Sequence, residues 1–102
     1  MFYNENMETL LEEIKNKKLV LDVFKALSNE LRLDIVQSLS KSPKYVNDLQ
    51  EEFSNYDPTS ISKQLAVLKN SGIVDSVREG KKIKYYLKLD CVGKMIMCID
   101  SH

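Results

Sequence analysis

The chain has 102 residues, of which 43% are apolar and 29% are charged, and its formal net charge is zero. These values indicate one small globular domain and exclude a disordered chain, and no apolar stretch approaches the roughly 20 residues that cross a bilayer. The N-terminus lacks the basic and apolar regions of a signal peptide, so we expect a cytoplasmic protein with reduced cysteines.

The charge is unevenly distributed along the chain. Residues 59–88 carry seven basic and two acidic side chains, for a net charge of +5. Residues 1–58 carry seven basic and eleven acidic side chains, for a net charge of −4. Local potential governs contact with phosphates more than the total charge does. The basic segment is therefore the expected surface for a polyanion.

Apolar residues at helical spacing predict four helices ahead of the basic segment. An amphipathic first helix is expected over residues 5–17, and a short second helix over about 20–27. Asn29 is a suitable N-cap for a third helix, which is expected to end just before Lys41. A fourth helix is expected over about 45–53.

The next segment predicts a helix that turns polar groups outward. Ile61 and Leu65 recur at the spacing of a buried helical face. Asp57 is the expected N-cap, and Pro58 suits the first turn because no backbone donor is lost there. Gly72 can take the left-handed conformation that often ends a helix.

The period of the pattern then changes from 3.6 to 2. Residues 73–78 and 82–88 alternate apolar and polar side chains around the turn Glu79-Gly80, which predicts a hairpin with one basic face. A last helix is expected over about 91–100, with Asp90 as its N-cap. The predicted fold class is mainly α with a small β-hairpin wing, in one domain over residues 1–102.

Hydroxyl, amide and ammonium groups on this helix and hairpin are the groups that read base edges and hold phosphates. Gln64 suits pairing with adenine, and the hydroxyls suit phosphates or base edges. The alternatives are an ordinary solvated helix face and lysines that protect the edge of a sheet. The candidate DNA-binding residues are Thr59, Ser60, Ser62, Lys63, Gln64, Lys69, Arg78, Lys81, Lys82 and Lys84.

Five segments resemble, in order, the ArsR/SmtB family of winged helix-turn-helix repressors. The resemblance implies a homodimer that is held by the first and last helices, binds operator DNA, and releases it when an inducer binds. The segments are Ala26–Val36, Asp48-Leu49, Ser60–Leu68, Ser71–Val74 and Arg78–Lys82.

The chain departs from this family at positions that matter for metal binding. Gln64 stands where the family usually has histidine, and Tyr45 and Asn47 stand where its metal-binding cysteine pair would fall. Asp90 is followed by Val92, which does not fit the paired Asp/His ligands of the zinc site in the last helix. We therefore expect neither a metal site nor a cofactor.

Apolar residues of the first and last helices exceed what one small core needs and are expected to pair two copies. Cys91 and Cys98 either fill this interface or form a redox or soft-metal sensor across it. Seven residues apart on one helix, they lie about 10 Å apart and cannot bridge each other. The candidate interface residues are Met7, Leu10, Leu11, Ile14, Met95, Ile96 and Ile99.

The function predicted from sequence is a DNA-binding transcriptional regulator, namely a repressor that binds its operator as a homodimer. A thiol-based sensing repressor and a winged-helix protein–protein interaction module are the alternatives. An enzyme is not expected, because the single histidine, His102, is terminal and neither a Gly-rich phosphate loop nor an HExxH motif is present.

Overall fold

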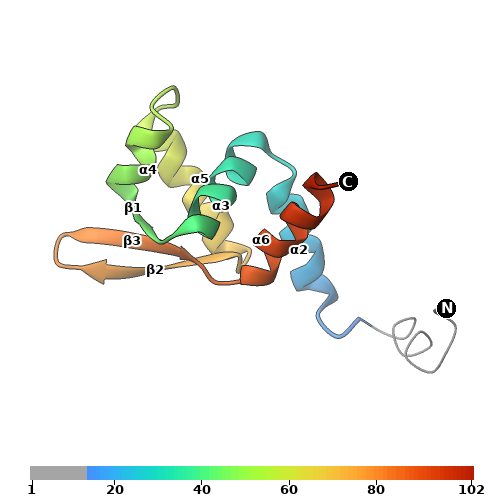
Figure 1. Cartoon of the computed structure of the whole chain (residues 1–102). Helices are drawn as coiled ribbons and strands as arrows, with labels where there is room; N and C mark the ends of the chain where they lie inside the picture. The colour runs from blue at the N-terminus through green and yellow to red at the C-terminus, as the bar shows by residue number, and fades with distance from the viewer. Residues whose placement is uncertain (1–13) are drawn as a thin grey trace, which may run out of the picture.

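The computed structural model describes residues 14–102, and its element order confirms the predicted fold class. In Figure 1 the hairpin projects as an arm from one end of a helical body, and α2 and α6 lie at the other end. No helix in this range is long and apolar enough to cross a membrane. The elements are α2 (Lys17–Leu27), α3 (Glu30–Lys41), β1 (Lys44–Tyr45), α4 (Val46–Glu52), α5 (Pro58–Asn70), β2 (Val74–Glu79), β3 (Lys82–Leu87) and α6 (Asp90–Asp100).

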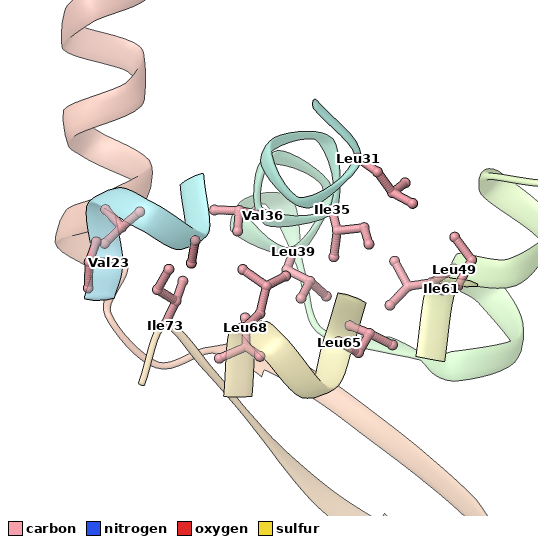
Figure 2. Packing of buried hydrophobic residues seen from close by; sticks show 13 residues of the cluster. Val23, Leu31, Ile35, Val36, Leu39, Leu49, Ile61, Leu65, Leu68 and Ile73 are labelled. Carbon is pink, nitrogen blue, oxygen red and sulfur yellow. The ribbon is translucent and has the colours of Figure 1, made fainter. Parts of the chain in front are cut away.

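The core lies between α3, α4 and α5 and fixes the orientation of α5. Ile35 of α3, Leu49 of α4 and Ile61 of α5 are fully buried, and Leu65 is nearly so. Figure 2 shows these four side chains gathered in one cluster. Burying one such side chain is worth about 1.5–3 kcal/mol. Because this face of α5 is locked inward, its polar face is held toward solvent.

Three of the predicted helix boundaries are confirmed. The Asn29 side chain caps α3, because its Oδ1 accepts the backbone N–H of Arg32 at 3.0 Å. Pro58 lies in the first turn of α5. Gly72, just after α5, has a φ of 86° in the left-handed region, which favours glycine.

Other predicted helix starts differ from the structure. Asp57 occupies the N-cap position of α5 as predicted, but its side chain makes no capping hydrogen bond. The prediction for Asp90 is wrong, because this residue already lies inside α6, whose N-cap is Leu89. Most of the helix predicted over residues 5–17 lies outside the described residues. Residues 14–16 are not helical, and α2 begins at Lys17.

The sheet has a third strand that the sequence did not reveal. β1 pairs antiparallel with β3, so the sheet order is β1-β3-β2. Tyr45 of β1 stands opposite Lys84 of β3. A strand of two residues is too short for an alternating pattern to show. Its pairing ties the segment between α3 and α4 to the middle of β3.

Only residues 71–73 connect α5 to β2. The carbonyl of Ile73 accepts two backbone N–H groups, from Lys88 at 2.9 Å and from Leu89 at 3.1 Å. The end of α5, the start of β2 and the exit of β3 therefore meet at one fully buried residue.

Candidate nucleic-acid interface

Helix α5 and the hairpin, residues 74–87, which we call the wing, meet at one open cleft of about 360 Å³. Ser62 of α5 lines it, together with Lys81 and Lys82 at the tip of the wing and Asn47 of α4. The structure thus brings together three of the residues predicted to bind DNA. Hydroxyl and ammonium groups beside a groove are suited to phosphate oxygens.

The outward surface of α5 carries two further predicted residues. Thr59 and Lys63 are exposed, whereas Ile61 between them is fully buried. The alternation follows from the 3.6-residue period of the helix. Lys63 therefore presents its ammonium to solvent on the same helix that lines the cleft.

Ser60 and Gln64 lie on a different flank of α5. They line a second hollow of about 270 Å³ with Tyr56 and with Asn29 at the start of α3. The half-buried Gln64 accepts a hydrogen bond at its Oε1 from Nη1 of Arg32, at 2.6 Å. Pairing with adenine through both ends of the amide would require this oxygen as an acceptor.

Two other predicted cations have partners within the protein. Lys69 Nζ donates to Ser76 Oγ at 2.9 Å and lies 3.9 Å from Asp75 Oδ1. Arg78 Nε donates to the carbonyl oxygen of Gly80 at 3.3 Å, across the turn of the wing. Their contact with DNA stays a prediction.

A cluster that we call the Tyr45 clasp holds the wing near its turn, where Glu79 pairs with Lys82. The hydroxyl of Tyr45 donates to Glu79 Oε1, and Lys84 Nζ lies 3.1 Å from Glu79 Oε2. The ammonium groups of Lys82 and Lys84 lie 5.2 and 5.1 Å from the centre of the Tyr45 ring, within the range of cation–π attraction. No role for Tyr45 was predicted. The clasp holds Lys84, a predicted phosphate ligand, against Glu79.

The clasp shifts the pKa values of Glu79, Tyr45 and Lys84. The hydrogen bond from Tyr45, and after it the one from Lys84, lowers the pKa of Glu79 below its ordinary value of 4.5. The same carboxylate raises the pKa values of Tyr45 and Lys84. A lowered folded-state pKa stabilises the fold above the unfolded pKa. The contribution of Glu79 is therefore lost as the pH falls through its folded pKa, and is intact at neutral pH.

Replacing Glu79 by glutamine is expected to strengthen binding of duplex DNA at low salt, whatever its sequence. The change removes a negative charge from the wing and releases the Lys84 ammonium, which then neutralises one more phosphate. The slope of log affinity against log salt should steepen by about one per protomer. Titrations of one labelled duplex at several salt concentrations measure this slope. Asp100→Asn on α6 is the matched control, and equal slopes for the two variants would contradict the role of the clasp.

Helices α2 and α6, which lie at the end of the molecule away from the wing, each expose large apolar side chains, and we call these side chains together the pairing face. On α2 these are Leu21 and Phe24, the latter 53% exposed; on α6 they are Met97 and Ile99, the latter 66% exposed. Large exposed apolar side chains at one end of a protein indicate a contact with another protein. Of these four residues, only Ile99 was predicted from the sequence to lie in the interface.

The residues predicted for a dimer interface are distributed unevenly. Ile14 and Ile99 are exposed and available to a partner. Met95 and Ile96 are half-buried, and Ile96 packs against the core of its own chain. The remaining three, Met7, Leu10 and Leu11, lie outside the described residues.

The two thiols lie on α6 and are both exposed. Cys98 is followed by the C-terminal His102, whose Nδ1 lies 3.0 Å from the Cys98 carbonyl oxygen. Over residues 14–102, no three His, Cys, Asp or Glu side chains gather closely enough to hold a metal ion.

Comparison with known structures identifies the class of fold. The transcriptional repressor BigR from Xylella fastidiosa superposes with a TM-score of 0.75 at 29% identity, over 95% of this chain and 92% of that one. A homodimeric winged helix-turn-helix DNA-binding domain, Mb0332 from Mycobacterium bovis, gives a TM-score of 0.74 at 25% identity, over 99% and 88%. The fold is a winged helix-turn-helix.

Sequence comparison places the chain more narrowly. The model of the arsR family of bacterial regulatory proteins matches residues 29–76. The biofilm growth-associated repressor of Xylella fastidiosa is 36% identical over 83 residues, which cover 81% of this chain and 67% of that protein. The chain spans 62% of the length of the corresponding repressor from Agrobacterium fabrum. This protein belongs to the arsR family.

Proposed function

We propose that this protein is a transcriptional repressor that binds operator DNA as a homodimer in the cytoplasm. It acts by occupying DNA rather than by chemistry. Helix α5 enters the major groove, and the wing contacts the neighbouring backbone. Two copies paired through α2 and α6 present two such surfaces, about 34 Å apart, to successive major grooves.

The observation that carries this proposal is the convergence of Ser62, Lys81 and Lys82 on one cleft. These residues come from separate parts of the sequence, yet their polar groups line the same concave surface. They belong to residues 59–88, a segment with a net charge of +5. A polyanion is the ligand that such a surface fits, which disfavours a protein–protein interaction module.

Support for the dimer comes from the pairing face and from relatives. Its exposed apolar side chains, Phe24 and Ile99 among them, gain stability when a second copy covers them. The related domain Mb0332 is described as homodimeric. A dyad-symmetric operator is the natural partner of such an assembly.

Selection of bound sequences from random duplex DNA tests the proposal. We expect an enriched, dyad-symmetric site whose half-sites lie about 10–10.5 base pairs apart, bound with an affinity that falls as salt rises. Failure to bind any duplex at low salt would overturn the proposal. Enrichment of an asymmetric single half-site would contradict binding as a homodimer but would leave the binding of DNA itself in place.

A thiol-sensing repressor is the second candidate, and the exposure of Cys91 and Cys98 favours it. One straight helix keeps them about 10 Å apart, so an internal disulfide is excluded. Across the pairing face, Cys91 of one protomer is able to meet Cys98 of the other if the two α6 helices run antiparallel.

Mass spectrometry of the dimer, with and without oxidant or zinc, tests the sensor. The sensor requires an intermolecular disulfide or a bound metal, together with weaker binding to DNA. Two unmodified thiols and no metal would leave the cysteines as packing residues. The Cys91→Ser variant separates specific pairing from general oxidation, because it must abolish the response.

A further inference from the structure

Arg32 joins three helices through one guanidinium group. From its place near the start of α3, its Nε donates to the carbonyl oxygen of Ala26 in α2, at 2.7 Å. Its Nη1 donates to Oε1 of Gln64 in α5, at 2.6 Å. Ala26 is buried, and both bonds are partly shielded from water. Arg32 is thus tied to the body of the protein and to the helix proposed to read DNA.

The bond from Arg32 fixes which way the Gln64 amide points. The oxygen and nitrogen of a glutamine amide exchange places by a simple rotation, and the partner decides between them. A guanidinium has only donors, so it can face only the oxygen. The amide nitrogen Nε2 must then point away from Arg32. Bonds between a charged donor and a neutral acceptor are stronger than neutral ones, so this orientation is well held.

This orientation determines what Gln64 can offer to a base. Adenine presents an acceptor and a donor in the major groove, N7 and the N6 amino group, and glutamine matches it with both ends of its amide. Guanine presents two acceptors, N7 and O6. With Oε1 held by Arg32, Gln64 offers the two hydrogens of Nε2, which match guanine and meet the N6 amino group of adenine donor to donor.

We propose that Arg32 is a positioning residue that makes Gln64 a donor-only reader, so that the protein selects guanine over adenine at the base that Gln64 contacts. The inference rests on the proposed function, since it names what one residue of that DNA-binding surface recognises. A merely structural Arg32 would instead hold α2, α3 and α5 together, and its loss would weaken binding to every sequence alike.

The test compares base preferences rather than overall affinity. Sites selected from random DNA identify the position whose preference is lost in Gln64→Ala. Affinities are then measured for duplexes with each of the four bases there. Wild type is expected to favour guanine over adenine by about 10-fold, in the range of one good bidentate contact. In Arg32→Leu the Gln64 amide is free to turn. The ratio of the affinity for the guanine duplex to that for the adenine duplex should then fall by about 10-fold.

Gln64→Glu provides a second test that does not depend on the folding of Arg32→Leu. The carboxylate keeps the contact with Arg32 as an ion pair but has no hydrogen to donate. We expect a higher midpoint of thermal unfolding and loss of the guanine preference. A guanine preference that persists in Gln64→Glu, whatever the midpoint, would overturn the inference.

The outcomes separate this inference from the proposed function. A wild-type protein that binds no duplex overturns the proposed function itself. A protein that binds duplexes but prefers adenine at the Gln64 position, or keeps its guanine preference without Arg32, overturns only the role of Arg32. The same holds if no base position responds to Gln64→Ala.

Discussion

The Phe24→Glu variant is expected to be monomeric at micromolar concentration and to bind the operator at least about 100-fold more weakly. Phe24 is 53% exposed on the pairing face of α2. Burying one phenylalanine is worth about 1.5–3 kcal/mol, and twofold symmetry counts the residue twice. About half of this value applies, because Phe24 is already partly covered within its own chain, and each 1.4 kcal/mol is a factor of ten, so the dimer constant alone changes by about 10- to 200-fold. Two carboxylates at a dry interface add a further cost.

Sedimentation velocity measures the oligomeric state, and titration of the selected duplex measures the affinity. Lys25→Glu is the matched control, since it places the same carboxylate at an exposed, polar position of the same helix. It should remain dimeric. A Phe24→Glu protein that sediments as a dimer would show that copies pair through another surface.

Reversing the charges of Lys63 and Lys81 together is expected to abolish measurable binding of duplex DNA near 0.15 M salt, with a reduction in affinity of at least about 100-fold. One residue lies on the outward face of α5 and the other lines the cleft from the wing. Each phosphate contact that is removed lowers the slope of log affinity against log salt by about 0.9. Repulsion between the new carboxylates and phosphates weakens binding further.

The control reverses two exposed lysines outside residues 59–88, Lys25→Glu with Lys94→Glu. Both double variants change the net charge equally. A difference in their affinity for DNA therefore reports the positions of the lysines and not the total charge. Exposed substitutions of this kind change stability by about 0.5 kcal/mol or less, and unfolding midpoints should confirm it. Equally weakened binding in the two variants would mean that the cleft has no special part in recognising DNA.

Elements with a long, regular pattern were predictable from the sequence. Helix α5 shows its buried face through Ile61 and Leu65, and the wing shows its period of two around Gly80. In α5, burial of the periodic apolar residues decides the structure, and that signal is local. In the wing, Val77 and Ile83 remain exposed, at 44% and 39%, so the turn at Gly80 and the pairing of β2 with β3 decide the structure. Strand β1 was missed because two residues carry no period.

The site was predictable only as a set of residue types. Hydroxyls and lysines on α5 and the wing were recognised, and Ser62, Lys81 and Lys82 do meet. Contacts that depend on distant parts of the chain were not recognised. Arg32 and Gln64 are 32 residues apart, and Tyr45 and Glu79 are 34 apart. No spacing rule relates such pairs, because tertiary packing alone brings them together.

The caps of α5 and α6 show where local preference gave way to context. Asp57 and Asp90 are residue types that favour helix starts. Asp57 makes no capping hydrogen bond, and at α6 the chain enters the helix one residue earlier than expected, at Leu89. Leu89 packs against the core and donates its N–H to Ile73, so packing sets this boundary.

The three-residue connection between α5 and β2 has a consequence for how the protein leaves DNA. Ile73 anchors both strands of the wing beside the end of α5, and Lys69 joins that helix to Ser76. Helix α5 and the wing are therefore held together as one rigid unit, because the connection between them is short and hydrogen-bonded. A signal that tilts one must tilt the other. Dissociation should therefore follow a single exponential, in which the helix leaves the groove at the same moment as the wing leaves the backbone.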